Sequence, residues 1–363
     1  MVVETTQAWP VRPLLLLLLI AVAVVVVQAQ GAASTLSPEQ VVEGWARRAD
    51  RHPLVGKILR TDSGQVIDGI ALAQGSSAGA ITDALGLKGA RFILLGEVHD
   101  NAQHHLLRAG LIDDLTENGR FGRNAHPPVV VEHLRADQAA ALEEFRKLAR
   151  EANPVPDAAD IFRLVEWSKS GWPDAAMFRP LYDAMITARL RIVPGDVPRD
   201  RIRNLAREGI KVLDREDVTR LRLEEDFGHE SLEALKAELH RSHCGMLPES
   251  ALPPMAHAQR YRDVHLADAL LREAPVLGAA ILIAGNGHVR TDRGVPWHLR
   301  LRAPGKAIVS VMLIEIEDTR SDPQAYVPRD PQGRPVADAI IFTPRTVRED
   351  PCEKMRAHMQ KKG

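Results

Sequence analysis

Short apolar segments rich in Val, Ile and Leu recur along the chain, separated by longer segments in which apolar residues follow helical spacing. The apolar segments lie at residues 92–95, 127–133, 191–199, 278–288, 307–315 and 337–343, after a weaker one at 65–72. Strands that are apolar along their length are typical of parallel sheets buried on both faces. Their alternation with helices predicts an α/β fold, a mostly parallel β-sheet flanked by helices.

The spacing of apolar residues also predicts the helices and the domain plan. Helices are expected at 76–87, 136–150, 158–169 and 174–190, and Asp100 is placed to cap another that follows residue 100. Residues 200–275 lack a strand pattern, and we interpret them as a smaller all-helical subdomain inserted between two parts of the α/β domain, 37–199 and 276–345. The charged segment 346–363 is predicted to be a flexible tail.

The amino end has the features of a secretory signal. Residues 14–27 are uninterrupted Leu, Ile, Val and Ala, followed by small residues. This run is short for a bilayer span and suits a signal peptide. We predict a signal peptide at 1–29 and a linker at 30–36, with an uncleaved membrane anchor as the alternative. Both the signal peptide and the uncleaved anchor place the domain outside the cytoplasm, in the periplasm or associated with the membrane. The segment after the apolar run contains no Cys to which a lipoprotein anchor could be attached.

Charge and cysteine content narrow the classes of function. The 47 basic and 48 acidic side chains nearly cancel, so composition does not support a nucleic-acid partner. Cys244 and Cys352 are the only two cysteines. They can pair in an oxidising compartment, and they exclude covalent c-type haem, which needs Cys-x-x-Cys-His.

Polar side chains follow four of the predicted strands directly. They are Glu97 and His99, Glu132 and His133, Asp196, and then Asn286 and His288. The carboxyl ends of parallel strands meet at one edge of a sheet, so we expect these groups to share a crevice. One histidine at a strand end is more often a hydrogen-bonded loop residue, and Glu132 alone could be a salt-bridged carboxylate. The coincidence of four such strand ends favours a functional site.

Imidazole and carboxylate groups are normal ligands of divalent metals, so His99, Glu132 and His288 form a candidate metal site. Gly96, Gly285 and Gly287 would let the backbone turn sharply beside a ligand. We expect the crevice to be lined by residues at the strand ends, namely Gly96, Asp196, Gly285, Asn286 and Gly287.

Two segments resemble a known family. Gly-Glu-Val-His-Asp-Asn-Ala-Gln-His-His at 96–105 and Ala-Gly-Asn-Gly-His-Val-Arg-Thr-Asp-Arg-Gly-Val-Pro at 284–296 are similar to the ChaN-like haem-binding uptake family, within the Tiki and erythromycin-esterase-like superfamily. That superfamily is marked by two distant Gly-x-x-His elements, here Gly96 to His99 and Gly285 to His288. The segments 243–248 and 258–263 also resemble the family.

The resemblance implies a large α/β domain beside a small helical one, an extracytoplasmic location, and a role in bacterial haem or iron uptake. It implies haem as the cofactor, bound through Tyr and His, a haem-uptake receptor or transporter as partner, and a homodimer as one assembly. Among residues of suitable chemistry, His104 and His105 are candidate iron ligands. Tyr261 is a candidate phenolate ligand, with Arg262 as a propionate partner; the alternative is that its helix face packs on the α/β domain.

Two classes of function remain open. The favoured one is an exported haem-binding protein that acts in haem and iron uptake. The alternative is a metal-dependent hydrolase, in which a divalent metal held by His99, Glu132 and His288 activates water and Glu97 acts as general base. A third possibility is an exported scaffold protein that has this fold but no functional site.

Overall fold

A computed structural model describes residues 38–49, 51–74, 79–117, 126–276, 278–350, 352–353 and 356. The predicted signal peptide at 1–29 and linker at 30–36 lie outside these ranges. Within the described residues, no helix is both long and apolar enough to cross a membrane.

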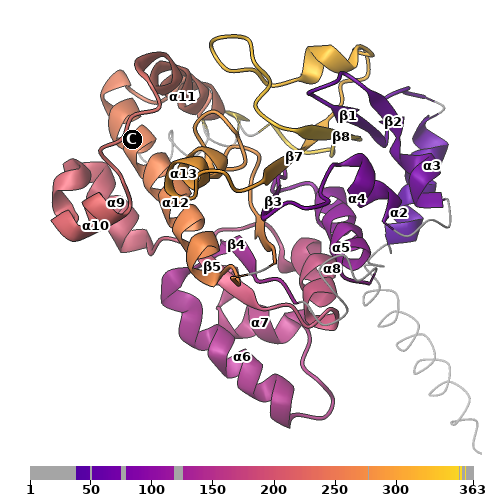
Figure 1. Ribbon diagram of the computed structural model, residues 1–363, viewed down its shortest axis with the longest axis horizontal. Helices are drawn as coiled ribbons and strands as arrows, with labels where there is room; N and C mark the ends of the chain where they lie inside the picture. Colours follow the sequence, from indigo (N-terminus) through magenta and orange to yellow (C-terminus); the bar gives the residue numbers. More distant parts are fainter. Residues whose placement is uncertain are drawn as a thin grey trace, which may run out of the picture. The chain divides into compact units, whose positions relative to one another are not determined.

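In the described ranges, eight strands form one sheet in the order β2-β1-β8-β7-β3-β6-β4-β5 (Figure 1). The strands β8, β7, β3, β6, β4 and β5 run parallel, and β1 pairs antiparallel with β2 and β8. The predicted α/β fold with a mostly parallel sheet is therefore confirmed. The strand bounds are β1 (Lys57–Arg60), β2 (Val66–Asp68), β3 (Phe92–Leu95), β4 (Val129–Arg135), β5 (Ile192–Asp196), β6 (Ala280–Ile283), β7 (Ile308–Glu315) and β8 (Ala339–Thr343).

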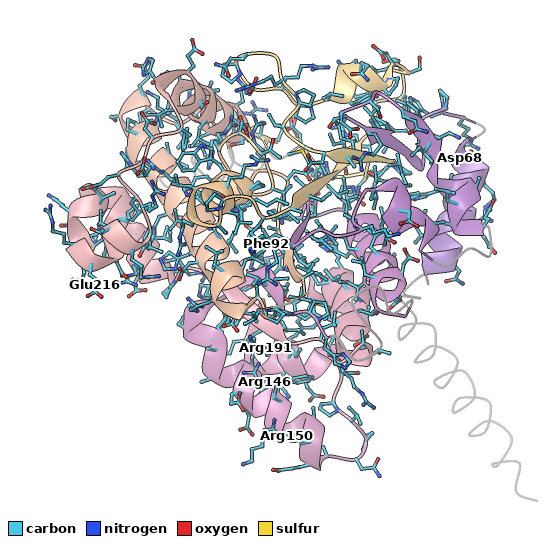
Figure 2. All side chains as sticks on the ribbon, viewed as in Figure 1. Asp68, Phe92, Arg146, Arg150, Arg191 and Glu216 are labelled. Atoms are coloured by element: carbon cyan, nitrogen blue, oxygen red, sulfur yellow. A yellow bond between two sulfur atoms is a disulfide. The ribbon has the colours of Figure 1, made fainter. Side chains whose placement is uncertain are left out.

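Strand β3 lies in the middle of the sheet, between β6 and β7. Successive strand residues face opposite sides, so Ile93 and Leu95 enter one hydrophobic core while Phe92 and Leu94 enter the other. Phe92 lies among densely packed side chains, whereas Arg150 and Glu216 project at the periphery (Figure 2). The uninterrupted apolar pattern of β3 thus reflects burial on both faces.

Helices cover both faces of the sheet. The core on one face contains side chains of α5, α6, α7 and α8, and the core on the other contains those of α2, α12 and α13. The helix bounds are α2 (Pro38–Ala49), α3 (Gly69–Gln74), α4 (Ala80–Ala84), α5 (Ala102–Glu117), α6 (Ala139–Glu151), α7 (Ala158–Leu164), α8 (Ala175–Thr187), α9 (Arg199–Glu208), α10 (Arg215–Arg220), α11 (His229–Ser242), α12 (Leu252–Glu273) and α13 (Val295–Arg302), with short 3-10 turns at Ala136–Gln138, Trp167–Lys169, Gly209–Val212, Glu249–Ala251 and Pro323–Tyr326.

Residues 200–275 contain only helices among their regular elements, and α9 to α12 are grouped on one side of the sheet (Figure 1). They have a small core of their own, which includes Leu205, Leu221 and Tyr261. The long helix α12 also extends back to the sheet, where Leu266 and Leu270 join its core. The helical segment is therefore tied to the sheet through α12.

Several local predictions differ from the structure. The helix expected at 76–87 is described as α4 at Ala80–Ala84, and Glu132, His133 and Asp196, which were expected to follow strands, lie within β4 and β5. The strand expected at 65–72 ends at Asp68, because the Asp68 side chain accepts a hydrogen bond from the Ala71 N–H at 3.1 Å and starts α3. Likewise, Asn101 caps α5 in place of Asp100, accepting from the Gln103 N–H at 3.0 Å. Asp100 instead pairs with Arg348, 2.9 Å away.

Candidate functional site

A crevice of about 550 Å³ lies where the carboxyl ends of the parallel strands face α11 and α12. Residues that follow β3 and β6, together with Glu132 within β4, form its floor, and the helices form its wall. The lining residues are Glu97, Val98, His99, Glu132, Phe227, Leu235, Glu238, Leu239, Ser242, His243, Gln259, Arg260, Arg262, Asp263, Gly285, Asn286, Gly287, His288 and Arg293. The structure thus brings together the two Gly-x-x-His elements.

Glu97 is the centre of one hydrogen-bonded cluster. Its carboxylate is buried and accepts from His99 Nδ1 at 2.5 Å and from His133 Nε2 at 2.8 Å. The fully buried Arg108 pairs with the other carboxylate oxygen. Because Glu97 holds the proton of His99 on Nδ1, the Nε2 atom of His99 is left as the free nitrogen of that ring.

The His99 ring is suited to act on a ligand. Its side chain is 36% exposed, and Nε2 lies 3.9 Å from Glu132 Oε1. Burial lowers the pKa of His99, and the neighbouring Glu132 only partly offsets this effect. The ring is therefore neutral at pH 7 and has a lone pair on Nε2 for a proton or a metal.

Glu132 is the centre of a second cluster. Its Oε2 accepts from the Gly285 N–H at 2.7 Å, and its Oε1 accepts from Arg262 at 2.8 Å. Arg262 also binds Asp196 through Nε at 2.8 Å. Burial acts to raise the pKa of Glu132, but His288, His99 and Arg262 outweigh it and hold the pKa well below the usual range.

His288 bridges two carboxylates. Its Nε2 lies 3.1 Å from Glu132 Oε1, and its Nδ1 lies 2.6 Å from Asp263 Oδ1. Burial alone would lower the pKa of His288, but Glu132 and Asp263 overcome it and raise the pKa to about 10. At neutral pH both ring nitrogens therefore carry protons and donate.

The predicted metal set of His99, Glu132 and His288 converges, yet the structure satisfies Glu132 with cationic donors. A metal at this set would have to displace a proton from His288, and Arg262 already binds the same carboxylate oxygen as His288. A different set, Glu97, His99 and His133, has ligand atoms within 4.8 Å of one another. The carboxylate and imidazole chemistry fits a divalent metal in either set, and the metal ligands remain a prediction.

The predicted haem ligands lie in the interior. His104 is fully buried: Nδ1 accepts from the Val98 N–H at 2.9 Å, and Nε2 lies 2.8 Å from Thr343 Oγ1. His105 is also fully buried, with Nδ1 accepting from Arg108 at 2.8 Å and Nε2 donating to the His99 carbonyl at 3.0 Å. These histidines thus position the β3–α5 loop, and all four ring nitrogens are engaged.

Tyr261 packs in the small helical core, where it is 1% exposed and contacts the His265 ring. Its ring therefore packs within the helical segment, whereas the alternative reading of its sequence position expected packing on the α/β domain. The other two tyrosines of the chain, Tyr182 and Tyr326, are also buried. Among the described residues, no tyrosine lines the crevice.

The predicted crevice residues divide into two groups. Gly285, Asn286 and Gly287 line the crevice, whereas Gly96 and Asp196 do not: Gly96 lies against Asn286, and Asp196 binds Arg262. Gly96 and Gly285 are required for space, not for a sharp turn: a Cβ would lie 2.3 Å from Asn286 Oδ1 at the first and 2.8 Å from His99 at the second.

Several site residues were missed from the sequence, chiefly Arg108, Asp263, His243 and Arg260. All four lie on helices or at a helix end, so no strand-end rule could find them. Asp263 and Arg260 belong to the Ala-Gln-Arg-Tyr-Arg-Asp segment at 258–263. The available signal for these two residues, and for His243 in the segment 243–248, was the resemblance of both segments to the family.

Comparison with known proteins places the fold. A solved structure of ChaN of Campylobacter jejuni, described as cofacial heme binding, is similar at a TM-score of 0.56 and 20% identity, over 78% of this chain and 95% of that chain. A mutant of the erythromycin esterase EreC in its open conformation matches at a TM-score of 0.37 and 19% identity, over 77% and 83% of the two chains. No curated protein matches the sequence.

The family model described as "Haem-binding uptake, Tiki superfamily, ChaN" matches residues 84–299. This segment includes both Gly-x-x-His elements and every residue that lines the crevice. The resemblance found in the sequence is therefore confirmed, and the chain belongs to this haem-binding uptake family of the Tiki superfamily.

Proposed function

We propose that the protein binds haem in the crevice between the strand ends and helices α11 and α12. The observation that carries the proposal is the family match over residues 84–299, since it contains the whole lining of the crevice. Support also comes from ChaN of Campylobacter jejuni, a structure of cofacial heme binding that shares the fold.

The donor set of the crevice fits haem. Iron needs an axial donor, and His99 and His243 both line the crevice with an Nε2 atom that makes no hydrogen bond to a described residue. One of these two histidines would therefore hold the haem iron, in place of the buried His104, His105 and Tyr261. Bound haem would supply a redox-active iron centre, and the chain would orient it and restrict access of water.

The test is a haemin titration of the purified chain followed by visible spectroscopy. A saturable Soret shift is expected in the wild type, and it should weaken about tenfold or more in His99→Ala or His243→Ala. His229→Ala is the matched control, because His229 is exposed and lies outside the crevice. If neither crevice variant differs from this control, the assignment of the axial ligand is wrong, and absence of any saturable shift would refute haem binding.

We further propose that the protein is exported and acts in haem and iron uptake, with a receptor or transporter as partner. The apolar run at 14–27 and the family's association with uptake support this. Fractionation of expressing cells tests it. The periplasmic or membrane fraction should contain the chain, and deletion of residues 2–29 should leave it in the cytoplasm.

A second candidate function is hydrolysis. It is favoured by the neutral His99 Nε2, which Glu97 orients toward the crevice. In that case His99 is the general base and Glu97 its positioning residue, because Glu97 itself is buried. A divalent metal would polarise the attacked group or a water. Metal analysis and chromogenic ester hydrolysis, in the wild type and in His99→Ala with His288→Ala, would test this reading.

A further inference from the structure

Arg260 on α12 is an unmatched cation in the crevice. Its Nε and Nη2 atoms are buried, and neither has a hydrogen-bond partner among the described residues. Leaving charged donors buried without a partner is unfavourable, so such donors usually mark a position that a ligand or water satisfies.

The other arginines that line the crevice are satisfied. Arg262 binds Glu132 and Asp196, and Arg293 binds Asp292 and Glu238. The carboxylates of the lining are likewise engaged, since Glu97 pairs with Arg108, Asp263 with His288, and Glu238 with Arg293. Arg260 is therefore the lining arginine that lacks a carboxylate partner within the described structure.

Two aromatic rings hold the Arg260 guanidinium in place. Its Cζ atom lies 5.4 Å from the Phe227 ring centroid and 5.9 Å from that of Trp297. The two rings meet edge to face at 5.9 Å. Such cation–π contacts fix the plane of a guanidinium and leave its N–H groups free to bind an anion.

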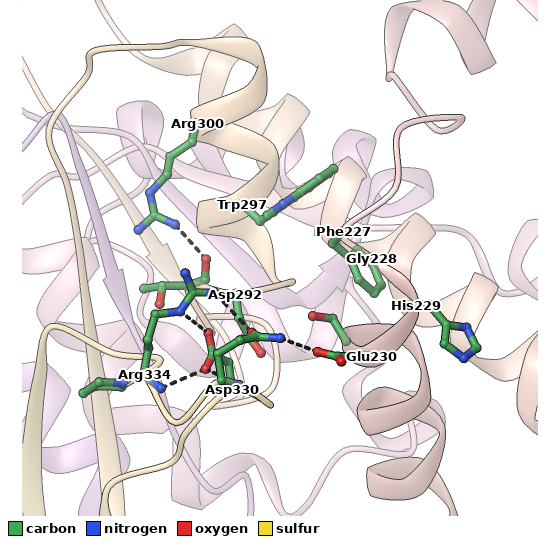
Figure 3. Close-up of a pocket in the computed structure, with 13 residues that line it drawn as sticks. Phe227, Gly228, His229, Glu230, Asp292, Trp297, Arg300, Asp330 and Arg334 are labelled. Carbon is green, nitrogen blue, oxygen red and sulfur yellow. Dashed lines mark hydrogen bonds and ion pairs between the residues drawn. The ribbon is translucent and has the colours of Figure 1, made fainter.

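A second cavity, which shares Phe227 with the crevice, does not supply the missing anion. It has a volume of about 620 Å³ and is lined by Phe227, Trp297 and several charged residues (Figure 3). Its carboxylates have other partners: Asp330 pairs with Arg334, Asp292 pairs with Arg290 and Arg293, and Glu230 accepts a hydrogen bond from Gln332. Burial lowers the pKa of Arg260, and the nearby Asp226 and Glu225 offset this effect only in part. These two carboxylates bind the Gly228 N–H and Arg222 instead.

We propose that Arg260 is the residue that binds a carboxylate of the crevice ligand, with Phe227 and Trp297 as its positioning residues. An arginine fork matches the two oxygens of a carboxylate, which gives both strength and orientation. This inference rests on the proposed function: if the ligand is haem, the carboxylate is a propionate.

The first test compares haemin with its dimethyl ester, which keeps the porphyrin and the iron but has no carboxylate. The full chain should bind haemin about ten- to hundredfold more tightly than the ester. Arg260→Gln should lose that preference, and Arg260→Lys should keep part of it. Arg241→Gln on α11 is the control, because Arg241 is exposed and does not line the crevice. Equal binding of haemin and ester by the wild type, or an unchanged preference in Arg260→Gln, would overturn the inference.

A second test does not depend on haem. In the chain labelled with ¹⁵N-arginine, the Arg260 Nε–H signal, identified by its loss in Arg260→Lys, should shift on titration with 3-phenylpropionate and not with the corresponding amide. If haemin fails to bind but this shift is present, the proposed function fails and the carboxylate site stands. If the signal does not move, the carboxylate site is wrong even where haemin binds.

Discussion

Glu97 shows how one buried carboxylate organises the site. It has no access to solvent, yet it contacts His99, His133 and Arg108. An isolated carboxylate would not stay ionised at such a position, so the neighbouring guanidinium and the two imidazole donors are what make its burial possible. By accepting the hydrogen bond from His99 Nδ1, Glu97 leaves the Nε2 atom of that ring for the crevice.

Replacing Glu97 should therefore affect stability as well as binding. Glu97→Gln leaves Arg108 charged, fully buried and without a counter-ion, and we expect the free energy of unfolding to fall by about 3–5 kcal/mol. Urea denaturation measures this change. Glu97→Gln with Arg108→Met removes both charges and should recover much of the loss. A loss below about 1 kcal/mol in the single variant would show that Arg108 finds another partner.

At the residue scale, the sequence revealed the groups that follow strands. Glu97, His99, Glu132 and His288 were expected to meet, because parallel strands end at one edge, and they do lie together. The roles of His104 and His105 were not visible in the sequence. Adjacent helix positions face different directions, and only packing shows that both rings turn inward to hold the loop after β3.

At the scale of elements, α5 is anchored by these buried histidines. Burial lowers the pKa of His104 to about 3 and that of His105 to about 4, so both stay neutral in the folded chain at mildly acidic pH. In the unfolded chain each ring takes up a proton near pH 6.5. At acidic pH, protonation of these two histidines in the unfolded chain therefore lowers the free energy of unfolding.

A pH titration of stability checks the effect. The folded pKa of His104 lies below its unfolded value, so the unfolded state binds more protons between about pH 6.5 and 3. The free energy of unfolding should fall as pH falls through this window, by up to about 1.4 kcal/mol per pH unit for this residue. His104→Gln should be less stable at pH 7 but show a shallower decline toward pH 4. An equal slope in wild type and variant would mean that His104 is not neutral in the folded chain.

The elements themselves followed from the sequence to different degrees. Long apolar runs such as β3 and β6 were recognisable because both faces are buried. Strand β1 was not recognisable, because its end residues are partly exposed and its position depends on antiparallel pairing with β8. The start of α3 directly after Asp68 was not recognisable either, because it depends on capping by the Asp68 side chain.

At the scale of the whole molecule, the carboxyl-terminal segment is anchored in two places. Arg348 pairs with Glu315 and with Asp100, close to the site loop. Cys352 forms a disulfide with Cys244, which directly follows the crevice residue His243. The sequence predicted a flexible tail from residue 346 and left the cysteine pairing open. Neither anchor follows from sequence periodicity, since both join segments far apart in the chain.

Removing the disulfide should lower stability. The disulfide joins two residues that are 108 positions apart in the sequence. Removing a native disulfide typically lowers the free energy of unfolding by about 2–5 kcal/mol. Cys352→Ser is expected to shift the urea midpoint downward, and reduction of the wild type should give the same curve. If reduction has no effect on the wild type, the two cysteines are not paired in solution.

The order of strands in the sheet has a consequence for how the protein is made. Phe92 of β3 pairs with Ala280 and Ile308, so the central strand stays without its neighbours until most of the polypeptide has emerged. A nascent chain halted before residue 288 has no His288 and therefore no complete pocket. The crevice can therefore form only after residue 293, the last of its lining residues, has been made, and a shorter translation product lacking β6 and β7 leaves an apolar strand unpaired.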